Sequence, residues 1–173
     1  QSGDNEVLKR MNRFYSTEDF RKIICRFREE IPDITIATDI ICGFPGESGK
    51  AFERTLELVE ETQPDIVNVS KFFPRPRTSA ERMEPRVPIR EVSERSRKIA
   101  DLSKKISSEK NEKWLGWEGR ILVDEKGKVS GSWIGRNSAY KPMVIKSDQA
   151  LLGKFIDVRV VKTFATYLEA KIL

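Results

Sequence analysis

A change of hydrophobic period near Gly116 constrains the fold of this chain more than any other feature. Before it, apolar residues recur every three or four positions in long segments that alternate with β-branched runs. After it, apolar and polar residues alternate in short segments separated by glycine-, asparagine- and serine-rich turns. The first pattern indicates helices alternating with strands, and the second indicates β-strands alone. We therefore predict two domains, residues 1–113 and residues 114–173.

Four helices are expected in the first domain. They cover 5–13, a segment from Ser16 or Thr17 to Pro32, a segment after Ser48, and a long helix of about 25 residues opened by Pro88. Serine and threonine are good helix N-caps, and proline is tolerated in a first turn. The second helix is amphipathic, because its apolar residues fall at helical spacing: Phe20, Ile23, Ile24, Phe27 and Ile31.

Two strands, over 34–42 and 66–73, are expected between these helices. The first is apolar on both faces, which is typical of a strand covered on both sides in a parallel sheet. Helix, strand, helix and strand with short connections predict an α/β fold built from βα units. Asp39 lies inside the first strand, where a buried carboxylate needs a partner. It is either a structural anchor or a ligand contact.

The second domain is expected to be a small antiparallel β-barrel of the oligonucleotide-binding type. Five strands fit into about 60 residues, with turns between them. Their predicted ranges are 117–124, 129–134, 141–147, 154–163 and 166–172. Five of their apolar residues are expected to point one way: Ile121, Val123, Val144, Val158 and Val160.

Composition excludes several classes of protein and favours one kind of partner. No apolar run is long enough to span a membrane, and no signal-peptide pattern opens the chain, so we expect a cytoplasmic protein. The two cysteines, Cys25 and Cys42, are too few for an iron–sulfur cluster or a zinc site, so we expect no metal site and interpret both as buried thiols. Residues 88–173 carry a net charge of +7 against −2 for residues 1–87. That asymmetry suits nucleic acid, although a solvated basic surface explains it equally well.

The loop 43–50 (GFPGESGK) looks at first like a phosphate-binding loop. That motif needs glycine, four residues, and then glycine, lysine and a hydroxyl residue. Here Phe44 stands in place of the first glycine and Ala51 in place of the hydroxyl. We therefore predict a tight turn at the carboxyl end of a strand, where parallel α/β barrels build ligand sites. An ordinary glycine turn is the alternative.

Two clusters combine basic and aromatic side chains, which together can bind nucleic-acid phosphates and stack on bases. One follows the second strand and contains Lys71, Phe72, Phe73, Arg75, Arg77 and Arg82. The other surrounds a loop of the small barrel and contains Trp133, Arg136, Asn137, Tyr140 and Lys141. The alternative is that the aromatic rings belong to the core and the basic groups are merely solvated.

Several of these segments, in this order, resemble the radical S-adenosylmethionine methylthiotransferases. Residues 1–4 (QSGD) with 11–15 (MNRFY) resemble the family's "LQSGS" and "MNRGY" signatures. Residues 38–47 (TDIICGFPGE) are similar to "TDIIVGFPGE", and 73–80 (FPRPRTSA) to "SPRPGTPA". Residues 135–141 resemble the TRAM domain that ends these enzymes. Three positions depart from the pattern: Asp4, Phe14 and Arg77.

The resemblance implies a fold, a reaction and two cofactors. The fold would be the C-terminal part of a partial (β/α) TIM barrel followed by the TRAM barrel. The whole enzyme would transfer a methylthio group to an adenosine of tRNA, using S-adenosylmethionine and two 4Fe-4S clusters. The cluster-binding cysteine motifs are absent from these 173 residues. We therefore expect the chain to be a fragment that is inactive alone, with no catalytic residue of its own and with the N-terminal part of the polypeptide as a partner.

The resemblance also assigns residues and a substrate. S-adenosylmethionine would be contacted by Gln1, Ser2, Gly3, Asp39, Ile41, Gly43 and Phe73. The anticodon stem-loop of tRNA would be contacted by Arg75, Arg136, Asn137, Tyr140 and Lys141. The TRAM segment resembles the archaeal and eukaryotic type, which implies threonylcarbamoyladenosine as the target. A methylthiotransferase for isopentenyladenosine or for a ribosomal protein, and a non-catalytic RNA-binding protein, are the alternatives.

Overall fold

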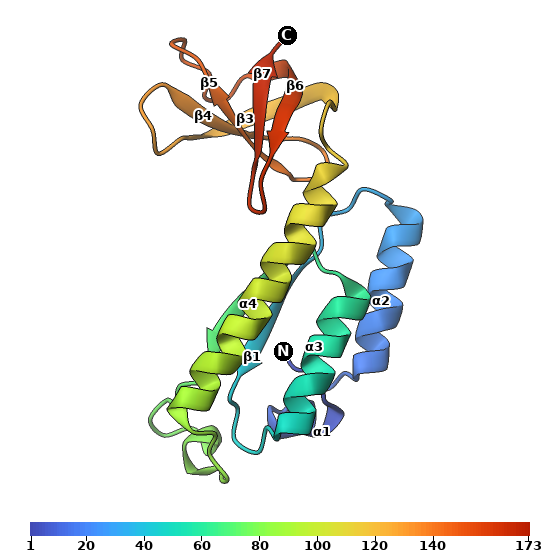
Figure 1. The fold of residues 1–173 in the computed structure, drawn as a ribbon, viewed down its shortest axis with the longest axis vertical. Coiled ribbons are helices and arrows are strands. Elements are labelled where there is room, and N and C mark those ends of the chain that lie inside the picture. Colours follow the sequence, from blue (N-terminus) through green and yellow to red (C-terminus); the bar gives the residue numbers. More distant parts are fainter. The chain divides into compact units, whose positions relative to one another are not determined.

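The computed structural model describes residues 1–173, which divide into two compact units (Figure 1). The first unit contains Gln1–Pro32 and Ile36–Ser103, and the second contains Asp33–Thr35 and Lys104–Leu173. The long helix α4 (Ile89–Glu112) supplies residues to both. None of the helices combines the length and the apolar composition that a membrane span requires.

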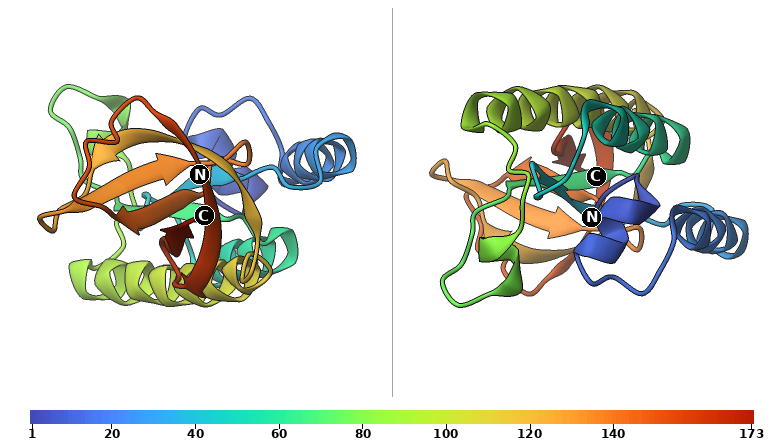
Figure 2. Two further views of the ribbon diagram at one scale, coloured as in Figure 1. Left: turned by 90° about the horizontal axis from the view of Figure 1, so that it is seen from above. Right: turned by 90° about the horizontal axis from the view of Figure 1, so that it is seen from below.

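The first unit is built on two parallel strands. β1 (Ala37–Cys42) pairs with β2 (Ile66–Lys71). Helix α3 (Gly49–Thr62) and the first part of α4 lie on the same side of this sheet (Figure 2). The other helices are α1 (Asn5–Arg10), α2 (Thr17–Glu30) and the 3-10 turn η1 (Ser79–Arg82). The α/β architecture and the four α-helices expected from the sequence are confirmed, although α1 ends three residues earlier than predicted.

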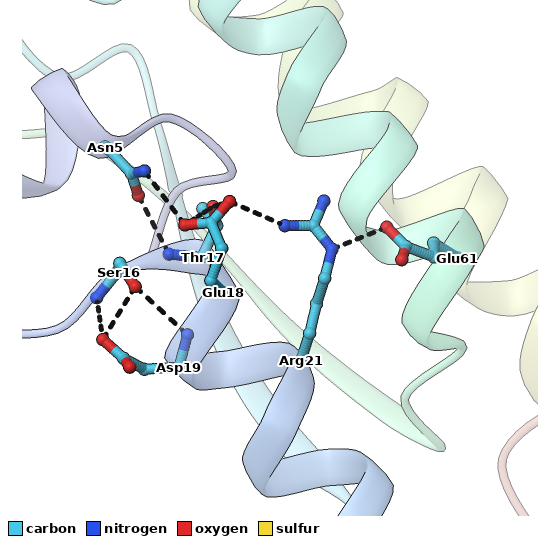
Figure 3. A network of polar contacts seen from close by, with 7 residues as sticks. All are labelled: Asn5, Ser16, Thr17, Glu18, Asp19, Arg21 and Glu61. Atoms are coloured by element: carbon cyan, nitrogen blue, oxygen red, sulfur yellow. Dashed lines mark hydrogen bonds and ion pairs between the residues drawn. The ribbon is translucent and has the colours of Figure 1, made fainter.

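Side-chain caps explain where two of these helices begin. Ser16 caps α2 in a capping box with Asp19, and Ser48 caps α3 through the N–H of Ala51. Both caps satisfy backbone donors that a helix leaves unpaired at its start. Polar side chains also join the start of α2 to its neighbours, as Figure 3 shows. Arg21 contacts Glu18 and, at 2.8 Å, Glu61 of α3.

The expectation that β1 is covered on both faces is wrong. Ile40 and Cys42 are buried on the helix-covered face. Ala37 and Asp39 are exposed on the other face, so Asp39 is not a buried carboxylate. The sequence misleads because Ile41, which shares the exposed face, is apolar and partly buried.

The apolar stripe of α2 is only partly covered. Ile24 is buried, whereas Ile23 is 54% exposed and Phe27 and Ile31 are each 50% exposed. The stripe borders a hollow of about 330 Å³ lined by Lys22, Ile23, Arg26, Phe27, Glu30 and Ile31. The amphipathic pattern therefore predicts the helix correctly, and much of its apolar face lies open in this chain.

The second unit is a closed five-stranded barrel in the order β3-β4-β5-β7-β6. Its strands are β3 (Glu118–Lys126), β4 (Ser132–Arg136), β5 (Pro142–Lys146), β6 (Phe155–Thr163) and β7 (Leu168–Ile172). Each neighbouring pair is antiparallel except β5 and β7, which are parallel. The expected small barrel of antiparallel strands is therefore confirmed, and its one parallel pair arises because a ring with an odd number of strands cannot alternate direction at every step.

The fully buried side chains of the barrel interior come from β3, β5, β6 and β7 and from the connecting segments, and Trp133 of β4 packs against them. Its buried members are Trp114, Ile121, Val123, Ala139, Met143, Ile145, Leu151, Val158, Val160, Leu168 and Ala170. Val144, which we expected to point the same way as Ile121, does not belong to this core. Met143 and Ile145 are the inward residues of β5, and alternation places Val144 on the opposite side.

Candidate cofactor face and candidate RNA-binding surface

The exposed face of the β1–β2 sheet carries a small polar cluster in the middle of the two strands. The Asp39 carboxylate accepts a hydrogen bond from Asn68 Nδ2 at 2.9 Å. The N–H of Ile41 donates to the backbone carbonyl of Gln1 at 3.0 Å, which brings Gln1 alongside β1. Tyr15 donates its hydroxyl proton to Gln1 Oε1 at 2.5 Å and thereby orients that side chain. The structure therefore places Gln1, Asp39 and Ile41 together.

Ser2 and Gly3, also expected to contact a cofactor, lie buried against α3. The Gly3 N–H donates to Thr55 Oγ1 at 2.9 Å, and the Ser2 hydroxyl lies 3.4 Å from the same oxygen. A Cβ on Gly3 would stand 2.3 Å from the Arg54 carbonyl oxygen. Close packing of backbone on helix therefore explains this glycine without any ligand.

The loop after β1 is closed by its own hydrogen bonds. The N–H of Gly43, whose φ is +80°, donates to Glu47 Oε2 at 2.7 Å. The N–H of Glu47 donates to the carbonyl of Phe44 at 2.9 Å, and that of Gly46 to the carbonyl of Pro85 at 2.8 Å. These three donors are used inside the protein and do not form a phosphate cradle, in agreement with the sequence argument.

Glu47 forms a buried ion pair with Arg95 of α4. Arg95 Nη1 lies 2.6 Å from Glu47 Oε2 and 2.9 Å from the Glu47 carbonyl oxygen. Only 5% of the Arg95 side chain and 1% of the Glu47 side chain are exposed. Burial raises the pKa of Glu47, whereas the hydrogen bonds from Arg95 and from the Gly43 N–H oppose that shift.

The segment after β2 presents an aromatic ring and cations to solvent. Phe73 is 81% exposed, whereas its neighbour Phe72 packs edge-on against Phe44 with ring centroids 5.1 Å apart. Arg75 is exposed. Arg77 has φ +66°, a left-handed conformation that favours glycine. The departure from the family's glycine at this position therefore occurs on a backbone suited to glycine.

The two cofactors implied by the resemblance fit this chain differently. The polar face offers hydrogen-bonding groups of the kind that bind a nucleoside, from Asp39, Gln1 and Asn68, and Phe73 is an exposed aromatic ring beyond the end of β2. An iron–sulfur cluster does not fit, because no group of three or more potential metal ligands is present. Cys25 is exposed, contrary to our expectation of two buried thiols, whereas Cys42 is buried with its pKa raised to about 12, mainly by desolvation.

Arg136, expected to bind RNA, lies on the barrel surface between two carboxylates. Its guanidinium forms ion pairs with Asp124 and, at 3.5 Å, with Glu125. It also lies over the ring of Tyr140, 5.1 Å from the centroid. Tyr140 is 66% exposed, so its ring does not fill the barrel. The exposed ring backed by a cation is a group that can stack on a base.

Asn137 and Lys141 are buried and shape the turn that carries Tyr140. Asn137 Oδ1 accepts from the backbone N–H of Lys141 at 3.0 Å, and the Asn137 carbonyl accepts from the N–H of Tyr140 at 2.9 Å. Trp133, from the same cluster, packs against the barrel core and donates to the Ser147 carbonyl at 3.1 Å. Of the four residues expected to bind RNA in this loop, only Tyr140 is mainly exposed.

The structure adds surface groups that the sequence reasoning missed. Phe164 and Tyr167, between β6 and β7, stack with centroids 4.5 Å apart, and Lys162 lies 4.9 Å from the Phe164 centroid. Leu122 and Phe155 pair across β3 and β6 and are 38% and 67% exposed. In the sequence, the closeness of Lys162 to Phe164 and Tyr167 could have indicated the stacked pair.

The second unit contains a TRAM domain. Residues 114–173, which include the whole five-stranded barrel, match the family model described as "TRAM domain".

The whole chain is similar to curated tRNA methylthiotransferases. It is 40% identical over 173 residues to a probable threonylcarbamoyladenosine tRNA methylthiotransferase of Pyrococcus horikoshii. It is 40% identical over 170 residues to the protein of the same description from Methanothermobacter thermautotrophicus. A tRNA-2-methylthio-N(6)-dimethylallyladenosine synthase of Aquifex aeolicus is 36% identical over 173 residues. The alignments cover 98–100% of this chain but only 39–40% of each relative, so the chain spans about two fifths of their length.

Proposed function

We propose that this chain is part of a tRNA methylthiotransferase that adds a methylthio group to threonylcarbamoyladenosine beside the anticodon. The observation that carries the proposal is the 40% identity, over 98–100% of the chain, to relatives described by that activity. The TRAM domain supports it, because a domain that binds RNA suits a tRNA substrate. Cytoplasmic location belongs to the same proposal.

We infer that the exposed face of the β1–β2 sheet is one wall of an S-adenosylmethionine pocket in a partial (β/α) barrel. When bound, S-adenosylmethionine supplies the radical and the methyl group. The protein's own groups would bind and orient it: Asp39 and Gln1 through hydrogen bonds, and Phe73 through its open ring. Gly43 would act indirectly, since its backbone shapes the neighbouring loop.

The cluster ligands and the remaining barrel strands are assigned to another part of the same polypeptide. Two features of the first unit support this. The backbone carbonyls of Ile36 and Cys42 accept hydrogen bonds from residues beside or within β2. The backbone N–H and carbonyl groups of the intervening odd-numbered residues of β1 therefore point to the opposite edge of that strand. At that edge the carbonyl of Gln1 already binds Ile41, and the neighbouring peptide groups of Ala37 and Asp39 suit a further parallel strand.

We propose that the TRAM barrel holds the anticodon stem-loop. Tyr140 is the residue best placed to stack on a base, with Arg136 behind its ring. Asn137 and Lys141 would act by holding the Tyr140 turn. Arg75, an exposed cation of the first unit, is proposed as a separate contact with RNA.

An anaerobic transfer assay with the full-length protein tests this proposal. The protein is supplied with methyl-labelled S-adenosylmethionine and tRNA that carries either threonylcarbamoyladenosine or dimethylallyladenosine. We expect label in the first tRNA, and Asp39→Ala should reduce S-adenosylmethionine binding while Asp101→Ala, on the exposed side of α4, should not. Label in neither tRNA would contradict the proposal.

Transfer to dimethylallyladenosine alone would favour the second candidate function. The 36% identity to the Aquifex aeolicus synthase, over the same 173 residues, is the observation that keeps this candidate open.

A further inference from the structure

We propose that Arg95 is a positioning residue that holds the loop 43–47 in its ligand-binding shape through Glu47. The proposal rests on the assignment of the β1 end to the S-adenosylmethionine pocket. It concerns a residue of α4 that lies 48 positions beyond its partner in the sequence.

The geometry shows how one side chain can fix the whole loop. Glu47 ties the loop together, because its carboxylate accepts from the N–H of Gly43 at 2.7 Å. Arg95 Nη1 binds both that carboxylate and the backbone carbonyl of Glu47. Arg95 Nη2 binds Glu91, one turn earlier on the same helix. The loop is therefore fastened to α4 at its side chain and at its backbone.

The surroundings leave this arrangement little freedom. Val92 of α4 fills the space beside Gly43, since a Cβ built on Gly43 would stand 2.3 Å from Val92 Cγ2. The Arg95 guanidinium also lies over the ring of Phe52, 5.3 Å from its centroid. Both members of the ion pair are almost fully buried, so water screens them little. Because Gly43 directly follows the strand that carries Asp39 and Ile41, movement of the loop would disturb the proposed cofactor wall.

Arginine suits this task better than any other cation. Its planar guanidinium presents several donors in fixed directions, and here it contacts two carboxylates and one carbonyl at once. A lysine would keep the positive charge beside Glu47 but concentrates its donors on one nitrogen. A lysine at position 95 could therefore neutralise Glu47, but it could not make the same set of hydrogen bonds to the loop.

Four forms of the full-length protein separate these roles: the wild type, Arg95→Lys, Arg95→Met and Ile99→Ala. Ile99 lies one turn further along α4 and is fully buried, so its truncation weakens packing and removes none of the hydrogen bonds that hold the loop. The measurements are the dissociation constant of S-adenosylmethionine by titration calorimetry and the midpoint of thermal unfolding. A wild type that fails to bind S-adenosylmethionine would refute the cofactor assignment itself.

For a positioning residue, Arg95→Lys unfolds close to the wild-type temperature and binds S-adenosylmethionine about tenfold more weakly or worse, because misplacement of the wall is costly. Ile99→Ala unfolds at a lower temperature and keeps the wild-type affinity. The proposal is overturned if Arg95→Lys binds as tightly as the wild type. It is also overturned if Arg95→Met loses no more affinity than Ile99→Ala does.

Discussion

Two glycines of the first unit differ in what surrounds them, and their substitution makes a prediction at the scale of single residues. Gly3→Ala would place a Cβ 2.3 Å from the Arg54 carbonyl oxygen and 2.5 Å from the Thr55 Cα, both of them backbone atoms. We expect it to destabilise the chain by about 1–3 kcal/mol. Nothing lies within 4 Å of a Cβ on Gly49, at the start of α3.

Gly49→Ala is therefore the matched control. It should leave stability unchanged or raise it by about 0.4–1 kcal/mol, because alanine restricts the unfolded chain. Urea unfolding of the two variants beside the wild type provides the comparison. Equal stability of the Gly3 and Gly49 variants would show that the approach of residues 1–3 to α3 is not tight.

The sequence identifies candidate residues better than it identifies their surroundings. It marks Asp39, which is exposed, and the turn at 136–141, which presents the exposed ring of Tyr140. It cannot show that Asp39 is exposed, because the strand around it is largely apolar. It also gives no sign that Arg136 is paired with Asp124, which lies 12 residues away on another strand.

At the scale of elements, α2 is an amphipathic helix whose apolar face is only partly buried by the rest of this chain. The Ser16 cap sets where the helix begins and Ile24 is buried, whereas Ile23, Phe27 and Ile31 are about half exposed. An open apolar face of this kind marks a surface that other residues cover or that causes aggregation. The relatives, more than twice as long as this chain, have residues that could cover it.

The double substitution Ile23→Ser and Phe27→Ser tests this interpretation of α2. In the 173-residue chain we expect higher solubility and at most a small loss of stability, because both side chains are half exposed. In the full-length protein the same change should destabilise by several kcal/mol, since it then removes buried apolar groups. Lys22→Ser with Arg26→Ser, on the rim of the same hollow, is the control. A small effect in the full-length protein would mean that the face stays open there.

The barrel shows which elements a pattern can define. Strict alternation in β3 and β6 predicts their inward residues, and Ile121, Val123, Val158 and Val160 are all buried. The run Met143-Val144-Ile145 is apolar throughout, so alternation cannot say which side faces inward, and the assignment of Val144 fails for that reason. The parallel pairing of β5 with β7 depends on the number of strands in the ring, which no single segment encodes.

At the scale of the whole molecule, the two units carry different kinds of surface. The first has a polar sheet face beside a loop that two buried charges hold. The second has a barrel with an exposed tyrosine backed by an arginine. A nucleoside cofactor suits the first surface, and an RNA loop suits the second. Together with the relatives' descriptions, this division is the basis of the function that we propose.

Nucleoside mass spectrometry of tRNA from cells that lack the gene tests that claim most directly. The strain is compared with its parent and with a strain complemented by the full-length gene. Our account predicts that the methylthio form of threonylcarbamoyladenosine disappears, that its unmethylthiolated precursor accumulates, and that complementation restores the parental pattern. An unchanged level of the methylthio form in the strain without the gene would contradict it.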